Sequence, residues 1–183
     1  LFAYVLGLGF SNHMTAVLLL PGFIYLFFTA FGFNKESFKR ILLLVPVFLL
    51  GLSIYLYLPI RSSVKPLLDW GHPASIESFF WHVTGKQFRV WMFSSLDVVK
   101  KQLSFFINNF TTEFNITALA FVLIGIIVLF KRSRRIALFL LILFFTTILY
   151  AANYDIFDIN TYFLLSYIAA GWMAVYGIGF VLD

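Results

Sequence analysis

The sequence is dominated by apolar runs that are long enough to cross a lipid bilayer. About 20 apolar residues in a helix span the hydrocarbon core. Leu1–Phe10 is expected to be the tail of one such span. Five further runs reach or approach that length, and they are Met14–Phe33, Ile41–Ile60, Ile116–Phe130, Ile136–Ala152 and Thr161–Leu182. The pattern predicts an all-α integral membrane protein with about five complete transmembrane helices and a partial one.

Composition supports the same class. The 183 residues are 62% hydrophobic and only 11% charged, whereas soluble domains are about half apolar and about a quarter charged. The net charge is +5, but the basic residues gather beside apolar runs. Such clusters set membrane topology, so nucleic acid is not expected as a partner. The chain has no cysteine, which excludes disulfides and thiolate chemistry.

Two basic loops predict the orientation of the spans. Asn34–Arg40 ("NKESFKR") and Lys131–Arg135 ("KRSRR") are expected to be cytoplasmic, because short cytoplasmic loops are enriched in Lys and Arg. The segment 61–115 and the turn Asn153–Asn160 then face outward. We expect a single membrane domain over 1–183, made of the spans in 1–60, the outer segment 61–115 and three spans in 116–183. The chain is expected to be an internal piece of a multi-pass protein of a bacterial inner membrane or the endoplasmic reticulum membrane.

The outer segment is predicted to hold two short helices. Ser75 is expected to cap the first, and Gly85 suits its end. The second starts after Ser95, with an apolar stripe that includes Leu96, Phe106 and Ile107. Both helices are too short and too polar to span, so we expect them to lie in the membrane interface.

The polar residues of the outer segment are candidates for ligand binding. The guanidinium of Arg61 suits a phosphate or carboxylate, although an arginine at a membrane edge can also be a plain anchor. Asp69 and Trp70 lie in "DWGHP", a turn signal. They suit a sugar or a lipid headgroup, but Trp70 is equally typical of the aromatic belt of a membrane protein.

A second group of candidates follows that turn. His82, Lys86 and Arg89, together with Arg61, predict a basic outer patch that contacts anionic headgroups or holds a lipid-linked phosphate. His13 lies at a break between apolar segments, where a simple cap by Ser11 or Asn12 is the competing interpretation.

Asp155 and Asp158 are further candidates on the outer side. Their simpler role is to precede a helix that begins near Thr161 with Asn160 as its cap. Two carboxylates at this spacing are weak evidence for a divalent ion. His72 and His82 lack the close His, Asp or Glu neighbours of a metal site, so no metal site is predicted.

Three motifs resemble a known family. They are "GLGFSNHMTAVLLLPG", "YLYLPIRSSVKPLLDWGHPASIESFFWHVTGKQF" and "YDIFDINTYFLLSYI". The chain resembles the protein O-mannosyltransferase-like membrane proteins of the GT-C glycosyltransferase superfamily. The resemblance implies a multi-pass enzyme that transfers a sugar from a polyprenyl-phosphate donor to a protein or glycan acceptor on the outer face. The positions that match the family pattern are His13, Arg61, Asp69, Trp70, Gly71, His82, Thr84, Gly85, Asp155 and Asp158.

The resemblance implies donor-phosphate and sugar binding for these residues. The acidic base of the family lies in an outer loop that this chain lacks, so no catalytic residue is expected within it. No cofactor motif is present, and the expected partners are membrane lipids, the lipid-linked sugar and its acceptor. Two other classes stay open, which are a lipid or solute transporter (a flippase, for example) and a non-catalytic membrane scaffold. The interiors of the predicted spans contain almost no charged residues, and this disfavours the transporter hypothesis.

Overall fold

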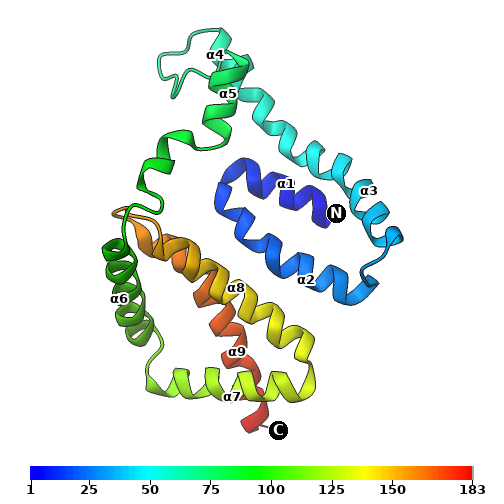
Figure 1. The fold of residues 1–183 in the computed structure, drawn as a ribbon, viewed down its shortest axis with the longest axis vertical. Coiled ribbons are helices and arrows are strands. Elements are labelled where there is room, and N and C mark those ends of the chain that lie inside the picture. The colour runs from blue at the N-terminus through cyan, green and yellow to red at the C-terminus, as the bar shows by residue number, and fades with distance from the viewer. Residues whose placement is uncertain (183) are drawn as a thin grey trace. The chain divides into compact units, whose positions relative to one another are not determined.

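The computed structural model describes residues 1–182 and consists of helices joined by loops (Figure 1). Within that part of the chain there is no β-strand, only an isolated bridge between Met92 and Tyr154. The all-α prediction is therefore confirmed. The helices in chain order, with 3₁₀ segments marked η, are α1 (Phe2–Asn12), η1 (Met14–Leu19), α2 (Leu20–Phe31), α3 (Lys35–Leu52), η2 (Ser53–Leu56), α4 (Tyr57–Ser63), α5 (Ile76–Val83), η3 (Lys86–Trp91), α6 (Leu96–Glu113), α7 (Ile116–Arg132), α8 (Arg134–Ala152), η4 (Ile159–Phe163) and α9 (Leu164–Leu182).

Several of these helices are long and apolar enough to cross a membrane, which indicates a membrane-embedded protein. Four qualify by length and composition, and they are Met14–Phe31, Lys35–Ser63, Arg134–Ala152 and Ile159–Leu182. They cover four of the five predicted runs. The remaining run is α7, which meets α6 at a bend of 101°. If that bent pair is one span, the structure has five candidate spans among its described residues.

The chain forms two compact units. The first contains Leu1–Val17 and Phe31–Val90, and the second contains Leu18–Ala30 and residues 91–182. The division into a single domain with three segments stays a prediction.

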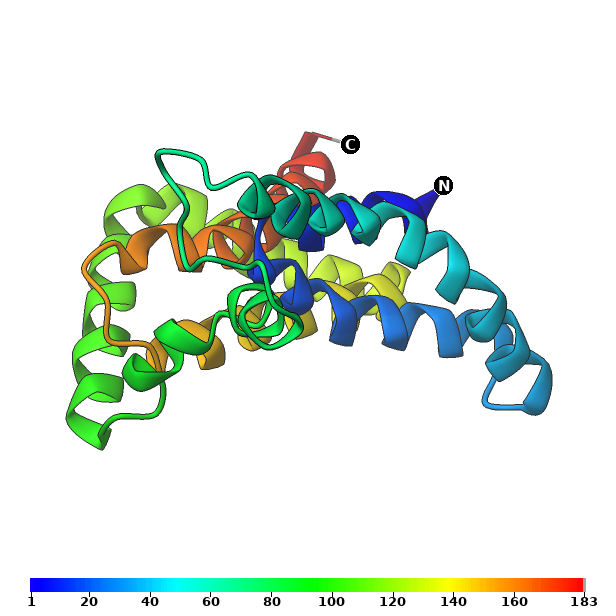
Figure 2. The same cartoon turned by 90° about the horizontal axis from the view of Figure 1, so that it is seen from above.

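In the first unit, α1 packs closely against α3, and the two helices lie side by side in both views (Figures 1 and 2). Glycines make this approach possible. A Cβ at Gly7 would overlap the Phe48 carbonyl oxygen, and one at Gly51 would overlap that of Tyr4. Small residues at a helix crossing let the backbones come together, as is common in membranes.

The long helical stretch Lys35–Ser63 is capped at its start by Asn34, whose side chain accepts a hydrogen bond from the Ser37 N–H at 3.0 Å. It changes to 3₁₀ geometry at η2 before returning to α4. Pro59 explains the change, because proline has no N–H to donate to the carbonyl four residues earlier. At about 1.5 Å per residue, the 29 residues exceed the hydrocarbon thickness. The two polar residues Ser62 and Ser63 therefore lie at the end of the stretch, after its apolar part.

In the second unit, α7 and α9 cross at two glycines. A Cβ at Gly125 would overlap the Met173 carbonyl oxygen, and one at Gly177 would overlap that of Phe121. Around this crossing α7, α8 and α9 enclose one apolar core, formed by Val122, Leu129, Ala137, Leu140, Ala170, Met173 and Ala174. The crossing thus fixes the relative position of the helices on which the unit is built.

Helix α6 packs along α8 and the turn that follows it. Gln102 is buried and donates through Nε2 to the Tyr154 carbonyl at 3.1 Å, and Lys101 pairs with Asp155 at 3.1 Å. The buried face of α6 contains Gln102 and Phe106, whereas Leu96 and Ile107 are exposed. Both residues belong to the predicted apolar stripe, whose contact with the membrane interface stays a prediction.

Candidate functional site

The helix predicted to start after Ser75 is present as α5. Ser75 caps it by accepting from the Ser78 N–H at 3.1 Å, and Ser78 returns a hydrogen bond to the Ser75 N–H at 3.1 Å. Gly85 follows the helix with φ of +59°, a conformation that glycine adopts without strain. These features confirm the predicted start and end of α5.

A hydrogen-bonded cluster of Ser62, Asp69 and His72 holds the loop between α4 and α5, which Figure 2 shows as an irregular stretch. The Ser62 hydroxyl, on α4, donates to Asp69 Oδ2 at 2.8 Å. His72 Nδ1 lies 2.6 Å from the same oxygen and 3.4 Å from the Ser62 hydroxyl. The sequence predicted a role for Asp69 but missed both of its partners.

The backbone of this turn is unusual at two successive residues. Gly71 and His72 both have positive φ, at +72° and +42°. Positive φ is strained for a residue with a Cβ, and such strain gathers at functional sites. A Cβ at Gly71 would lie 3.1 Å from His82 Nδ1, so His82 of α5 lies beside the turn. The structure thus places His82, a predicted site residue, beside the turn that begins at Asp69, another predicted one.

The electrostatics of the cluster favour an ionised Asp69. The hydrogen bond from Ser62 lowers the pKa of the Asp69 carboxyl, and the hydrogen bond and charge of His72 lower it further. Partial burial acts in the opposite direction but does not cancel the shift. A carboxylate at His72 Nδ1 fixes the orientation of the ring.

The cluster contains the residue types of a catalytic triad but not its geometry. Ser62 is only 1% exposed, and its hydroxyl donates to the carboxylate. In a triad the serine would donate to the histidine nitrogen remote from the acid. Ser62 is therefore a support for Asp69 and not a nucleophile. The most accessible member of the cluster is His72, whose side chain is 66% exposed.

The predicted basic residues of this unit have different surroundings. Arg61 is exposed, and its side chain has no ion pair or hydrogen bond among residues 1–182. Lys86 instead lies over the Trp81 ring, with Nζ 3.3 Å from the ring centroid. Arg89 in η3 and Trp70 in the turn are exposed. Arg61 is the cation that directly precedes the cluster in the sequence.

His13 forms the break between α1 and η1. Its Nδ1 accepts from the Thr15 N–H at 3.3 Å and lies 2.8 Å from the Thr15 hydroxyl. His13 is thus itself the cap of the following turn, in place of the predicted Ser11 or Asn12. Its neighbour Met14 lies beside Gly85, since a Cβ added at Gly85 would be 3.2 Å from the Met14 sulfur.

Asp155 and Asp158 belong to the other unit and have structural roles there. Asp155 pairs with Lys101, and its N–H donates to the Trp91 carbonyl at 3.0 Å. Asp158 precedes η4, and its carbonyl accepts from the Thr161 hydroxyl at 2.9 Å. Asn160 lies inside η4, so the predicted cap was wrong. The chain leaves Asp158 in a 3₁₀ turn before α9 begins.

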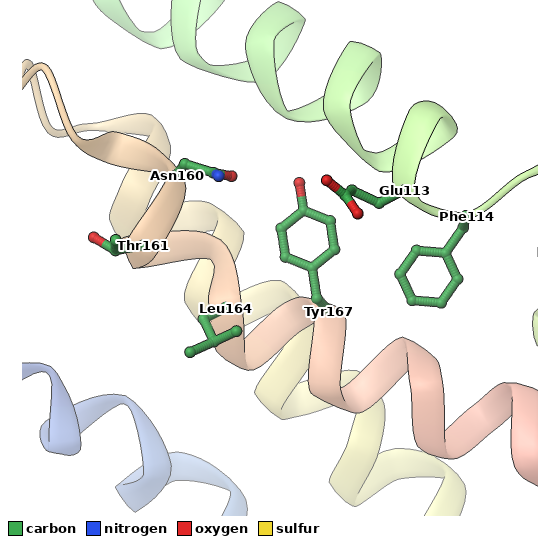
Figure 3. Close-up of a pocket in the computed structure, with 6 residues that line it drawn as sticks. All are labelled: Glu113, Phe114, Asn160, Thr161, Leu164 and Tyr167. Carbon is green, nitrogen blue, oxygen red and sulfur yellow. The ribbon is translucent and has the colours of Figure 1, made fainter.

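The second unit also contains a pocket of about 410 Å³ that the sequence did not suggest (Figure 3). It lies where α6 ends, beside η4 and the first turn of α9. The lining residues are Glu113, Phe114, Asn160, Thr161, Leu164 and Tyr167. Their only sequence signal is the position of Glu113 at the end of an amphipathic run.

Among residues 1–182, no three His, Asp or Glu side chains gather in a way that could hold a metal ion. Comparison with protein families, with curated proteins and with solved structures gave no match to this chain.

Proposed function

We propose that this chain is part of a GT-C membrane glycosyltransferase. It would transfer a sugar from a polyprenyl-phosphate donor to a protein or glycan acceptor, protein O-mannosylation being the specific form. The observation that carries the proposal is the exposed Arg61, whose side chain has no ion pair or hydrogen bond among residues 1–182, directly before the Ser62–Asp69–His72 cluster. A guanidinium can bind a phosphate through two parallel hydrogen bonds, and such a contact stabilises a phosphate that leaves from a sugar.

The surroundings of Arg61 support a role in donor binding. Arg61 lies near the end of the long apolar stretch Lys35–Ser63. The loop that follows it is held by the cluster and by the cap of α5. A lipid-linked phosphate needs that combination, because its chain lies in the bilayer while its headgroup meets water. Trp70, exposed in the turn, offers an aromatic face to a sugar ring. His82, Lys86 and Arg89 are proposed to complete the headgroup surface, with His13 near the end of α5.

The proposal includes an orientation. The loops 34–40 and 131–135 lie in the cytoplasm, five spans cross the membrane, and α5 and α6 lie in the outer interface. This arrangement puts Arg61 at the face where lipid-linked sugars are consumed. It is supported by the distribution of Lys and Arg and by the polar, exposed face of α6, with Lys100 and Lys101.

A transfer assay tests the proposal. Membranes containing the protein receive a labelled polyprenyl-phosphate sugar, and label entering protein or glycan is followed. Arg61→Ala is expected to lower transfer at least about tenfold, since hydrogen bonds to charged groups contribute about 1.5–3 kcal/mol. Lys39→Ala, which removes a cation from the opposite predicted face, is expected to leave transfer unchanged. Full transfer by Arg61→Ala would refute the proposed role of Arg61.

One observation favours a second function. The 101° bend between α6 and α7 resembles the broken helices that line sites in transporters. A lipid flippase is therefore the second candidate. It predicts movement of the lipid-linked sugar across vesicles containing the purified protein, in the absence of an acceptor. A transferase would leave the lipid in its original leaflet.

A further inference from the structure

The pocket at the end of α6 is lined by acceptors of hydrogen bonds and by apolar groups, and by no basic residue (Figure 3). It is distinct from the Ser62–Asp69–His72 cluster and belongs wholly to the second unit. The residues that matter are Glu113 from α6, Asn160 from η4 and Tyr167 from α9.

Glu113 is exposed and gives the pocket a negative charge. The Glu113 carboxylate has no ion pair with any residue of the described chain. It also lies in the last turn of α6, where the carbonyl ends of the helix carry partial negative charge and disfavour a carboxylate. A bound cation would pair with the carboxylate and would also offset its unfavourable position at the helix end. A neutral polyol could donate hydrogen bonds to the carboxylate but would not balance its charge.

The pocket also holds an unsatisfied hydroxyl. The Tyr167 hydroxyl is buried and has no hydrogen-bond partner within residues 1–182. It points toward the space between Asn160 and Glu113 (Figure 3). A buried polar group without a partner is unfavourable. A ligand that donates to this oxygen would give it a partner.

The three hydrogen-bond acceptors of the pocket match the three N–H donors of a primary ammonium group. A primary ammonium has three N–H donors and no acceptor. The Glu113 carboxylate, the Tyr167 hydroxyl oxygen and the Asn160 amide oxygen supply three acceptors. The apolar walls suit the carbon chain behind the nitrogen. Phe114 and Tyr167 stack with rings 6.2 Å apart and 9° from parallel, and aromatic faces attract cations.

The position of the pocket supports a binding role. Glu113, the last residue of α6, and Phe114 lie at the break where α6 meets α7 with a bend of 101°. Non-helical backbone at membrane depth is tolerated where it is buried in protein or lines a cavity. Here the break lines a cavity.

We propose that this pocket binds a primary ammonium group carried on an apolar stem. The group can come from two sources, the ethanolamine headgroup of a lipid or a water-soluble alkylamine. The inference stands apart from the proposed glycosyl transfer, and its test does not measure transfer.

The experiment uses the protein in nanodiscs of phosphatidylcholine, which has no primary amine. The soluble probe is n-butylammonium, its control is the neutral isostere n-butanol, and calorimetry measures their binding. The lipid probe is phosphatidylethanolamine, its control is the N-acetyl derivative, and native mass spectrometry measures their binding. We expect at least one amine to bind at least about tenfold more tightly than its neutral counterpart, as the loss of a charge-assisted contact implies. The probe that binds identifies the source.

Variants localise the binding. Glu113→Gln is expected to weaken amine binding at least about tenfold, and Tyr167→Phe about threefold, because a neutral hydrogen bond contributes less. Glu77→Gln removes an exposed glutamate of α5 and is expected to change nothing. Binding of neither amine, equal binding of charged and neutral probes, or full binding by Glu113→Gln would each overturn the inference. If Glu113→Gln fails to fold, the comparison of charged and neutral probes on the wild type still decides.

Discussion

At the scale of single residues, the loop between α4 and α5 is held by one carboxylate. Asp69 accepts from Ser62 and orients His72, and the turn between them has positive φ at two residues. A strained turn persists only where its surroundings hold it. The cluster therefore couples the order of the loop to the ionisation of Asp69.

The coupling predicts a dependence on pH. Because the pKa of Asp69 is lowered in the folded loop, the stabilisation is fully present above the ordinary carboxyl pKa of about 3.9. It is lost as the pH falls through the lowered value. Ser62→Ala is expected to raise the pKa of Asp69 toward its ordinary value, since the strongest stabilising contact is removed. Carboxyl-carbon NMR titration measures this pKa directly.

The neighbouring serine provides the control. The Ser63 hydroxyl donates to the Ile60 carbonyl of its own helix at 2.8 Å and does not touch Asp69. Ser63→Ala is therefore expected to leave the pKa of Asp69 unchanged. An equal shift in both variants would mean that the hydroxyl contact seen here does not stabilise the carboxylate.

At the scale of elements, close helix crossings depend on glycine. At the α7–α9 crossing, Gly125 and Gly177 face carbonyl oxygens of the partner helix. Backbone atoms cannot rotate away as a side chain can, so any added Cβ forces the helices apart. The surrounding core, which includes Leu129 and Met173, loses contacts with them.

Gly125→Ala is expected to destabilise the second unit by about 3 kcal/mol, the upper part of the range for overpacking. Gly179→Ala on α9 is the matched control, because a Cβ there meets nothing within 4 Å. Alanine is the better helix former by about 0.5–1 kcal/mol, so this variant is expected to unfold at the same or a slightly higher temperature. Thermal unfolding in detergent compares the two. Similar midpoints for both variants would show that α7 and α9 do not cross closely.

The contact between α6 and the turn after α8 depends on one buried amide. Gln102→Leu keeps the size of the side chain but leaves the Tyr154 carbonyl without its donor. We expect a loss of about 1–3 kcal/mol in the free energy of unfolding. Asn108→Leu, at an exposed position of the same helix, is expected to stay within about 0.5 kcal/mol. Denaturant titration measures both, and a tolerated Gln102→Leu would argue against this packing of α6.

At the scale of the whole molecule, the distribution of charge predicts the orientation in the membrane. The basic loops at 34–40 and 131–135 are expected on the same side, and the turn at 153–160 on the other. The chain has no cysteine, so a single introduced cysteine reports on one position without interference.

Labelling with a membrane-impermeant maleimide tests this orientation. Lys35→Cys and Ser133→Cys are expected to react only after the membrane is opened, and Phe157→Cys, at a fully exposed position, is expected to react from outside. The unmodified protein provides the blank. Reaction of all three from the same side would rule out the proposed topology and with it the outer position of Arg61.

The sequence by itself determined the class of the protein and the ends of several helices. Apolar runs of bilayer length predict membrane helices because lipid offers backbone groups no partners. Ser75, Ser95 and Gly85 mark helix ends through interactions with residues only a few positions away. Such local effects are present in any short stretch of sequence, so they can be predicted without the fold.

Only the tertiary structure decided which distant residues meet. Gly125 faces Met173, Gln102 reaches Tyr154, and Glu113 shares a pocket with Tyr167. The buried face of α6 likewise depends on what the helix packs against, and Leu96 and Ile107 of the predicted stripe lie outside it. Contacts between residues far apart in the chain depend on the backbone path that joins them, and no short sequence pattern encodes that path.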